Sequence, residues 1–337
     1  MSHQITLQPS GHQFKADDQT SLLQAALDAE LLVPYGCRDG ACGSCKARVI
    51  EGEFEHGRSP LSTLTEADRE KGMALLCCAQ ARSDMQIECR DVRRSGDIPL
   101  RKLPCRVTAL HLAAGDVMVV NLKLPANDVF RYLAGQYIDF LLADGRRRSF
   151  SIANAPGGES IELHIRKVDG GFFTEHVFAK MKERDILRFE GPLGGFFLRE
   201  SSKPVVFLAG GTGFAPIKAI VEDMRARGIK RPVTLYWGSR DSHGLYMAGL
   251  AHQWSKEIAD FRYVPVISGE PPADWPGRTG LVHQAVMDDL PDMSGVEVYA
   301  CGAPAMIEAA RGDFARCGLP EDAFFADAFT FATDALP

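Results

Sequence analysis

Long apolar runs, a basic excess and a disulfide-like cysteine pattern are all missing from this 337-residue chain. No apolar run approaches the roughly 18 residues needed to cross a bilayer. The first 14 residues hold no apolar segment bounded by a small-residue cleavage site, which argues against secretion. We therefore expect a cytoplasmic protein. With 38 Lys+Arg against 44 Asp+Glu, the chain also lacks the basic footprint of a nucleic-acid-binding protein.

Cysteine is the most informative residue that the chain does contain. There are nine cysteines, an odd number, and several are too close together in sequence for a disulfide framework. In a cytoplasmic chain such clustering is typical of metal binding or redox chemistry.

Negative charge is concentrated in residues 1–92, which carry 9 Lys+Arg against 14 Asp+Glu, whereas the remaining residues carry 29 against 30. An acidic first quarter could steer a basic protein partner towards it. A solvated acidic surface is the alternative, and charge alone does not separate the two.

The length, together with 45% hydrophobic residues, favours two or three globular domains. Residues 1–92 are compact and rich in short strands, with a capping-box-like helix start at Thr65. We expect Thr20 to cap an earlier helix. The expected strands of this module are Ile5–Leu7, Gln13–Lys15, Lys46–Ile50 and Met85–Cys89.

Residues 93–103 combine basic residues, Gly and Pro without apolar periodicity and are expected to be a linker. Residues 104–200 contain regularly spaced strand patterns separated by turn residues, which favour an antiparallel β-barrel with one helix near Thr174–Met181. The expected strands are Val117–Leu124, Gln136–Leu142, Arg147–Ile152, Ile161–Val168 and Ile186–Glu190.

Residues 201–337 alternate buried-type strands with helical stretches, which predicts an α/β domain with a parallel sheet. Its expected strands are Val205–Ala209, Val233–Trp237, Tyr263–Ile267 and Val298–Ala300.

The strongest motif is a cysteine-rich loop in which Cys37, Cys42 and Cys45 have C-x4-C-x2-C spacing, with Cys77 following after 31 intervening residues. Plant-type [2Fe–2S] clusters are bound by this arrangement. The intervening glycines allow backbone N–H groups to approach the anionic sulfurs. A structural zinc site is the alternative, but zinc ribbons usually pair two C-x2-C units and this segment has one.

The fourth ligand is either Cys77 or Cys78. The run Ala74–Ala79 resembles the ferredoxin pattern in which the ligand follows an apolar pair, and this favours Cys77. The other cysteines without partners at ligand spacing, expected in the core, are Cys89, Cys105 and Cys317.

A glycine turn follows the expected strand Val205–Ala209, with Gly210-Gly211-Thr212-Gly213 leading to Pro216 and a helix. A strand, glycine turn and helix N-terminus form the usual cradle for a dinucleotide pyrophosphate. The Rossmann fingerprint is incomplete here, so this motif alone is weak. Cys301-Gly302-Ala303-Pro304 also ends a buried strand, where ligands bind in open α/β sheets.

A carrier is needed between these two sites, because a nicotinamide delivers two electrons as hydride and a [2Fe–2S] cluster accepts one at a time. A flavin can serve as this carrier, because it accepts two electrons as hydride and is also stable at the one-electron stage. The strand Arg148-Ser149-Phe150-Ser151 could bind it: Arg148 at the pyrophosphate, Phe150 against the flavin or ribityl chain and Ser151 at flavin N5. The turn Gly170–Thr174 before a helix is a further natural anion site.

At these residues the chain resembles the ferredoxin–NADP reductase superfamily, in the fused arrangement of oxygenase reductases that carry an N-terminal ferredoxin module. The matching motifs are R-x-[YF]-[ST], GGTGxAP and CGxP. Within this group the sequence looks most like bacterial CDP-6-deoxy-glucoseen reductases, and phenol and benzoate oxygenase reductases are similar. The resemblance implies a β-grasp ferredoxin, an FAD-binding Greek-key barrel and an NAD-binding α/β domain.

The resemblance also implies roles for individual residues. Ser151 at flavin N5 and Cys301 near the hydride-donating carbon would serve catalysis. The residues implied in cofactor binding are Arg148, Phe150 and Ser151 for FAD; His164, Ile165 and Arg166 along the flavin; Gly171, Phe172, Phe173 and Thr174 at its pyrophosphate; Thr212, Gly213, Pro216, Cys301 and Gly302 for the nicotinamide nucleotide; and Phe329 as a cover for the flavin. Position 150 is Phe where relatives often have Tyr, and eight residues follow Phe329, which leaves its shielding role open.

We therefore expect an enzyme that takes hydride from NADH onto FAD and sends single electrons through the cluster to a partner dehydrase or oxygenase. A ferredoxin-like carrier without enzymatic activity is the remote alternative. NADPH is the less favoured nucleotide: Ser239 and Arg240 could bind its 2′-phosphate, but Asp241 beside them would repel it.

Overall fold

The computed structural model describes residues 2–89, 92–94, 96, 98–126 and 129–330. The chain forms two units. Unit 1 contains the residues up to Pro99 together with Gly194–Phe196 and Asp327–Thr330, and unit 2 contains Leu100–Leu193 and Phe197–Ala326. Among the described residues, no helix combines the length and apolar character needed to cross a membrane.

Unit 1 is built on a five-stranded sheet in the order β2-β1-β8-β4-β6. β1 (Ser2–Pro9) and β2 (His12–Asp17) form the expected antiparallel hairpin, and β8 (Met85–Cys89) pairs in parallel with β1. Ile5 and Leu7 alternate with more exposed neighbours and are fully buried, so one face of the sheet forms the core. The other elements are α1 (Leu22–Asp28), β3 (Leu31–Leu32), β4 (Lys46–Glu51), β5 (Phe54–Glu55), α2 (Glu66–Glu70), β6 (Met73–Leu75), β7 (Gln80–Ala81) and β9 (Arg93–Arg94).

Of the two N-cap residues expected in unit 1, one is confirmed and the other is wrong. Thr65 caps α2 in the expected capping box, with the Asp68 carboxylate accepting from the Thr65 N–H. The expected cap of α1 was wrong by one residue: Ser21 accepts from the Gln24 N–H, at 3.2 Å. Thr20 and Ser21 are both good N-cap residues, so sequence alone does not choose between them.

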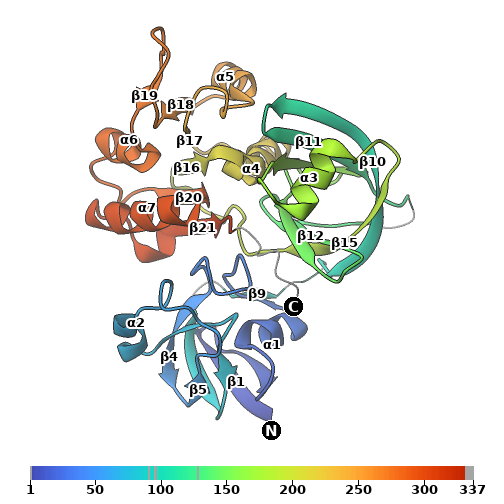
Figure 1. The fold of residues 1–337 in the computed structure, drawn as a ribbon. Coiled ribbons are helices and arrows are strands. Elements are labelled where there is room, and N and C mark those ends of the chain that lie inside the picture. Colours follow the sequence, from blue (N-terminus) through green and yellow to red (C-terminus); the bar gives the residue numbers. More distant parts are fainter. Residues whose placement is uncertain (1, 90–91, 95, 97, 127–128, 331–337) are drawn as a thin grey trace. The chain divides into compact units, whose positions relative to one another are not determined.

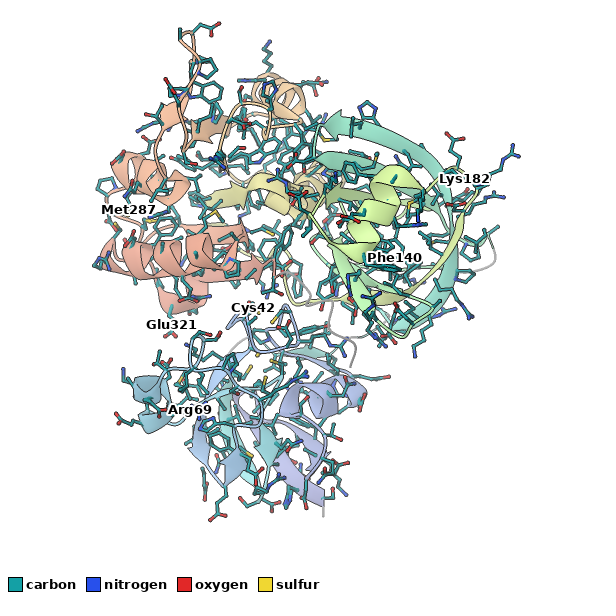
Figure 2. The ribbon with its side chains drawn as sticks, viewed as in Figure 1. Cys42, Arg69, Phe140, Lys182, Met287 and Glu321 are labelled. Carbon is teal, nitrogen blue, oxygen red and sulfur yellow. The ribbon has the colours of Figure 1, made fainter. Side chains whose placement is uncertain are left out.

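The first half of unit 2 is a six-stranded antiparallel sheet in the order β13-β12-β15-β10-β11-β14, which curves as Figure 1 shows. Five strands and the helix end within three residues of the expected positions. Phe140, labelled in Figure 2, is 1% exposed and belongs to the core of this sheet. The elements are β10 (Arg101–Ala114), β11 (Val117–Lys123), β12 (Tyr137–Leu141), β13 (Arg147–Ser151), β14 (Ser160–Arg166), α3 (Phe172–Ala179) and β15 (Ile186–Leu193).

The linker expected over residues 93–103 is partly strand. Arg93–Arg94 pairs with β3, and Arg101 begins the long strand β10. Along β10, Leu103 and Cys105 are buried between exposed neighbours. This alternation is a strand signal, but Pro and basic residues at the exposed positions hid it.

The second half of unit 2 is a six-stranded sheet in the order β19-β18-β17-β16-β20-β21, and the pairings from β19 to β20 are parallel. The four expected strands end within two residues of their expected positions, and every residue from Val205 to Ala209 is at most 2% exposed. Helices α6 and α7 pack against each other (Figure 1). The elements are β16 (Val205–Gly210), the 3-10 turn η1 (Gly211–Gly213), α4 (Phe214–Arg227), β17 (Val233–Ser239), α5 (Ala248–Glu257), β18 (Phe261–Ile267), β19 (Arg278–Thr279), α6 (Val282–Asp289), β20 (Glu297–Gly302), α7 (Pro304–Arg316), η2 (Glu321–Ala323) and β21 (Phe324–Ala328).

Candidate functional site

The cysteine loop of unit 1, residues 36–45, follows β3 and holds three of the four expected iron ligands, including Cys42 (Figure 2). Across the described ranges, no three His, Cys, Asp or Glu side chains are arranged to hold a metal ion. The cysteines instead form two pairs. Cys45 and Cys77 are 3.2 Å apart at Sγ, and the backbone N–H groups of Cys37 and Cys42 each donate to the other's sulfur, at 3.4 and 3.3 Å. A [2Fe–2S] cluster takes four cysteine thiolates, two on each iron, so these pairs fit its donor set.

The environment of the sulfurs separates their acidities. The hydrogen bond from the Cys37 thiol, assisted by Ser44, lowers the pKa of Cys42 to about 6 although burial opposes this. The same hydrogen bond and burial raise the pKa of Cys37. The hydrogen bond with Cys45 raises the pKa of Cys77 to about 12. Because iron binds thiolates, loading this site releases protons.

Gly40 supports the close packing of this loop. Its φ is +88°, and a Cβ added there would lie 2.8 Å from the Cys78 sulfur. Only glycine adopts such a backbone without strain, as expected for a loop that wraps a cluster.

Cys77 and Cys78 both bring their thiols to this site, 3.6 Å apart and buried. Cys77 is the one paired with Cys45, so it remains our predicted fourth ligand. The remaining cysteines expected in the core lie elsewhere: Cys89 in β8 and Cys105 in β10 are buried as expected, whereas the expectation was wrong for Cys317, which is only half-buried after α7.

The strand β13 carries the expected flavin residues. Ser151 at its end is buried, while Arg148 and Phe150 are half-buried and on the other side of the strand. The Arg148 guanidinium donates to the carbonyl of Arg147 at 2.8 Å. The Phe150 ring lies 5.6 Å from that of Phe173, so the structure brings together two residues from separate motifs.

Helix α3 begins at Phe172, with Gly171 at the N-cap and no side-chain cap. The Thr174 hydroxyl accepts from the Val168 N–H at 3.1 Å and stabilises the turn before the helix. Phe172 is 55% exposed beneath the guanidinium of Arg146, whereas Phe173 is buried. The two phenylalanines therefore face different surroundings.

Three consecutive residues of β14 were expected along the flavin, and the strand turns the middle one to the opposite face from the other two. Ile165 is fully buried in the hydrophobic core of the antiparallel sheet, so it does not accompany His164 and Arg166. The Arg166 guanidinium lies beside η1, since a Cβ added to Gly211 would be 3.1 Å from its Nη1. Among the described residues its Nη2 has no hydrogen-bond partner, and its Nε is 3.3 Å from Asp116. A half-buried arginine whose guanidinium has an unused donor is suited to an anionic ligand.

The glycine turn after β16 is packed against the end of β20. A Cβ on Gly213 would lie 2.0 Å from the carbonyl oxygen of Cys301, and one on Gly302 would lie 3.0 Å from the Gly210 Cα. Cys301 is fully buried and pairs with Ala209. The glycines are thus required by backbone contact between two strand ends.

Thr212 in η1 is half-buried and Pro216 in the first turn of α4 is buried. The Trp237 indole N–H donates to the Gly211 carbonyl at 2.9 Å and fixes the turn from the neighbouring strand. Trp237 also stacks on Phe214, with ring centroids 3.9 Å apart.

A cleft of about 600 Å³ lies beside Arg166, and Ser239, Arg240 and Asp241 line it from the end of β17. The Asp241 carboxylate accepts from the Gly244 N–H at 3.0 Å and so shapes the loop after β17. The cleft places the residues expected at the ribose next to Arg166.

Phe329 follows β21, is half-buried and belongs to unit 1, whereas Ser151 belongs to unit 2. Its expected role as a cover for the flavin stays a prediction.

Sequence reasoning named His164 but missed the polar residues that surround it, Glu162, Lys218, Glu222 and Tyr246. The His164 ring contacts the Tyr246 hydroxyl and the Glu162 carboxylate, and Glu162 contacts Lys218 on α4. Two signals were present: the alternation Glu162-x-His164 along β14, and the i,i+4 pair of Lys218 and Glu222.

Three family models match the chain in succession: a 2Fe-2S iron-sulfur cluster binding domain over residues 5–82, an oxidoreductase FAD-binding domain over 104–198 and an oxidoreductase NAD-binding domain over 207–312. The chain is also 46% identical to the CDP-6-deoxy-L-threo-D-glycero-4-hexulose-3-dehydrase reductase of Yersinia pseudotuberculosis, over 98% of this chain and 99% of the relative. The chain belongs to the fused ferredoxin–FAD/NAD reductases.

Other fused reductases are similar over their whole length. A reductase component of terephthalate 1,2-dioxygenase from Comamonas is 35% identical, with 98% of each chain covered. The crystal structure of an Amycolatopsis cytochrome P450 reductase matches with a TM-score of 0.79 and 32% identity, over 98% of this chain and 100% of that one.

This fused reductase is accordingly an NAD(P)H-dependent oxidoreductase with FAD and a [2Fe–2S] cluster. The expected [2Fe–2S], FAD and nicotinamide nucleotide cofactors and the oxidoreductase class are confirmed. The match to an iron–sulfur cluster binding domain decides against the structural zinc site. The matches to FAD- and NAD-binding domains decide against a ferredoxin-like carrier without enzymatic activity.

Proposed function

We propose that this reductase passes electrons from NADH through FAD and the [2Fe–2S] cluster to a dehydrase that acts on a CDP-6-deoxyhexulose. The observation that carries the proposal is the 46% identity to the Yersinia dehydrase reductase, which extends over nearly all of both chains. When bound, FAD accepts the hydride and supplies electrons one at a time, as the cluster requires.

Two residues are proposed to act at the hydride-transfer step. Ser151 would hydrogen-bond flavin N5 from the end of β13. The residue is largely buried there and keeps 8% of its surface exposed. Cys301 would position the nicotinamide from the end of β20, beside the glycine turn. No general acid–base pair is needed for hydride transfer.

FAD is proposed to lie along β13 and α3. Arg148 and the N-terminus of α3, residues 171–174, would bind its pyrophosphate. Phe150 would pack against the flavin or ribityl chain, supported from behind by Phe173. His164 is proposed at the flavin, and Ile165 supports the strand from the core.

The nicotinamide nucleotide is proposed to lie over the glycine turn, with Thr212, Gly213, Pro216 and Gly302 near the nicotinamide half. Arg166, first assigned to the flavin, is proposed to bind the nucleotide phosphates, because it lies against Gly211 with a free donor. The adenosine ribose would then lie in the cleft at Ser239 and Arg240. NADH is the proposed nucleotide.

We keep the finer architecture as a proposal: a β-grasp ferredoxin over residues 1–92, a connection over 93–103, a Greek-key FAD barrel over 104–200 and an NAD-binding α/β domain over 201–337. A cytoplasmic location is part of the same proposal.

Reconstitution tests the acceptor. The purified holoenzyme, NADH and a CDP-6-deoxy-hexulose-3-dehydrase with its substrate should give NADH consumption that depends on the dehydrase. An aromatic-ring oxygenase is the second candidate acceptor, because the terephthalate dioxygenase reductase is also similar over 98% of this chain. Faster NADH consumption with a terminal oxygenase than with the dehydrase would overturn the proposal.

A further inference from the structure

A buried lysine on α4 connects the two halves of unit 2. The Lys218 side chain is 8% exposed, and its Nζ lies 2.7 Å from the Glu222 carboxylate and 3.0 Å from the Glu162 carboxylate. It also donates to the carbonyl of Ala153 at 3.1 Å. An ammonium group has three donors, and all three are used here.

The contacts continue from Glu162 to two rings. Glu162 Oε1 also contacts His164 Nε2 at 2.9 Å, and His164 Nδ1 contacts the Tyr246 hydroxyl at 2.8 Å. Burial lowers the pKa of His164, which favours the neutral ring. A carboxylate accepts hydrogen bonds and cannot donate them, so Nε2 carries the proton and Nδ1 accepts from the tyrosine. Lys218 therefore fixes the orientation of His164 through Glu162.

These partners come from segments on both sides of the proposed hydride-transfer site. Ala153 follows Ser151 by two residues, and the Ala155 N–H donates to the Glu222 carboxylate at 3.3 Å. Lys218 lies in α4, the helix that begins directly after the glycine turn. One ammonium group thus joins the end of the flavin strand to the nucleotide-binding helix.

We propose that Lys218 is a positioning residue for hydride transfer, which holds the segment after Ser151 at a fixed distance from the glycine turn. The inference rests on the proposed placement of FAD at β13 and of the nucleotide at Gly210–Pro216. Small displacements between a hydride donor and acceptor cost large factors in rate, because transfer needs close, aligned atoms.

Removing the ammonium has two separable effects. Lys218→Met leaves the partly buried Glu162 and Glu222 carboxylates without their cation, which destabilises the fold. It also breaks the link from α4 to Ala153. The double variant Lys218→Met/Glu162→Gln removes the less exposed of the two unpaired charges. Its new amide oxygen still accepts from His164, but the link from α4 to Ala153 is not restored. The double variant therefore separates folding from positioning.

Anaerobic stopped-flow mixing of each holoenzyme with NADH tests the proposal, with the bleaching of flavin absorbance as the signal. FAD content and the thermal midpoint are measured on the same samples. We expect both variants to reach limiting rates at least about tenfold below the wild type. The NADH concentration at half-maximal rate should change less than about threefold. The double variant should regain part of the thermal midpoint that Lys218→Met loses, because only the Glu222 carboxylate then stays unpaired. Lys230→Met, an exposed lysine beyond α4, is the matched control and should behave as the wild type.

A wild-type rate in Lys218→Met, or recovery of the rate together with the thermal midpoint in the double variant, would overturn the inference. Failure of both variants to hold FAD would also overturn it, because Lys218 would then be needed for folding. If the wild type itself is not bleached by NADH, the proposed function fails, and this outcome is distinct from the others.

Discussion

The two redox regions of this reductase are built in opposite ways. The cluster site takes three of its four proposed thiolates from one nine-residue stretch, Cys37–Cys45, where backbone N–H groups contact the sulfurs. The proposed hydride-transfer region is assembled from the ends of β13, β14, β16 and β20, with backbones in direct contact and an ion network of partly buried side chains. A local loop can lose its ligand without disturbing a sheet, whereas strand ends in contact depend on the register of the whole domain. A substitution in the cluster site should therefore affect the cluster alone, whereas a substitution at the contacting strand ends should destabilise the whole domain.

The largest effect should follow a substitution at the contact of two strand ends. In Gly213→Ala the added methyl would lie 2.0 Å from the Cys301 carbonyl oxygen, so the backbones must move apart. We expect a loss of about 3 kcal/mol in the free energy of unfolding, together with loss of NADH oxidation. Thermal unfolding and dye reduction measure these effects. Gly249→Ala in α5 is the control, because no atom lies within 4 Å of its added Cβ. A Gly213→Ala protein with wild-type stability would break the comparison.

A substitution in the cluster site should remove the cluster and leave NADH-dependent reduction of the flavin intact. Cys77→Ser should lose or cripple the cluster's visible absorption, since its sulfur is paired with Cys45. FAD content and NADH-dependent dye reduction should remain. Cys78→Ser, the neighbouring control, should keep the cluster spectrum. The reverse pattern in the two variants would make Cys78 the ligand.

Deleting residues 1–92 sharpens the comparison at the level of the domain. The proposed hydride-transfer residues all lie in unit 2, so the truncated protein should still bind FAD. It should reduce an artificial dye with NADH at a rate within about threefold of the full chain, a margin expected when the reacting groups keep their geometry. Reduction of the protein partner should be lost. A truncated protein that is folded and holds FAD but no longer reduces the dye would show that the two regions are not independent.

The smallest effect is expected at the ribose end of the cleft. Asp241 shapes the loop beside Arg240 and would repel a 2′-phosphate. The wild type should therefore have the higher kcat/KM with NADH. Arg240→Gln should change that value less than about threefold, because a solvent-screened contact contributes little. Steady-state kinetics with both nucleotides measure this, and a higher kcat/KM with NADPH would reverse the assignment.

Signals that lie within a few residues of each other were readable from the sequence. The C-x4-C-x2-C spacing, the glycine turn before α4 and the strand around Phe150 each depend on local backbone geometry. The structure agrees with their placement in a loop, a strand-to-helix turn and a strand. Strand positions were equally accessible where alternation was clean, as in β8.

Features that depend on distant partners were not readable. Lys218 and Glu162 are 56 positions apart in the sequence, so nothing local marks them as an ion pair. The family resemblance assigned Arg166 to the flavin, but the fold brings the loop at Gly211 against it. Ile165 shows the same limit, since alternation along β14 turns it into the core while its neighbours face the site.

The central claim is that NADH reduces FAD and that the cluster is reduced through it. An anaerobic titration of the holoenzyme with NADH, followed by visible absorption and low-temperature EPR, tests this most directly. We predict that flavin absorbance bleaches and that the EPR signal of a reduced [2Fe–2S] cluster appears. In Cys77→Ser the flavin should bleach without that signal. A wild-type protein whose flavin bleaches while the cluster stays oxidised in excess NADH would contradict the account.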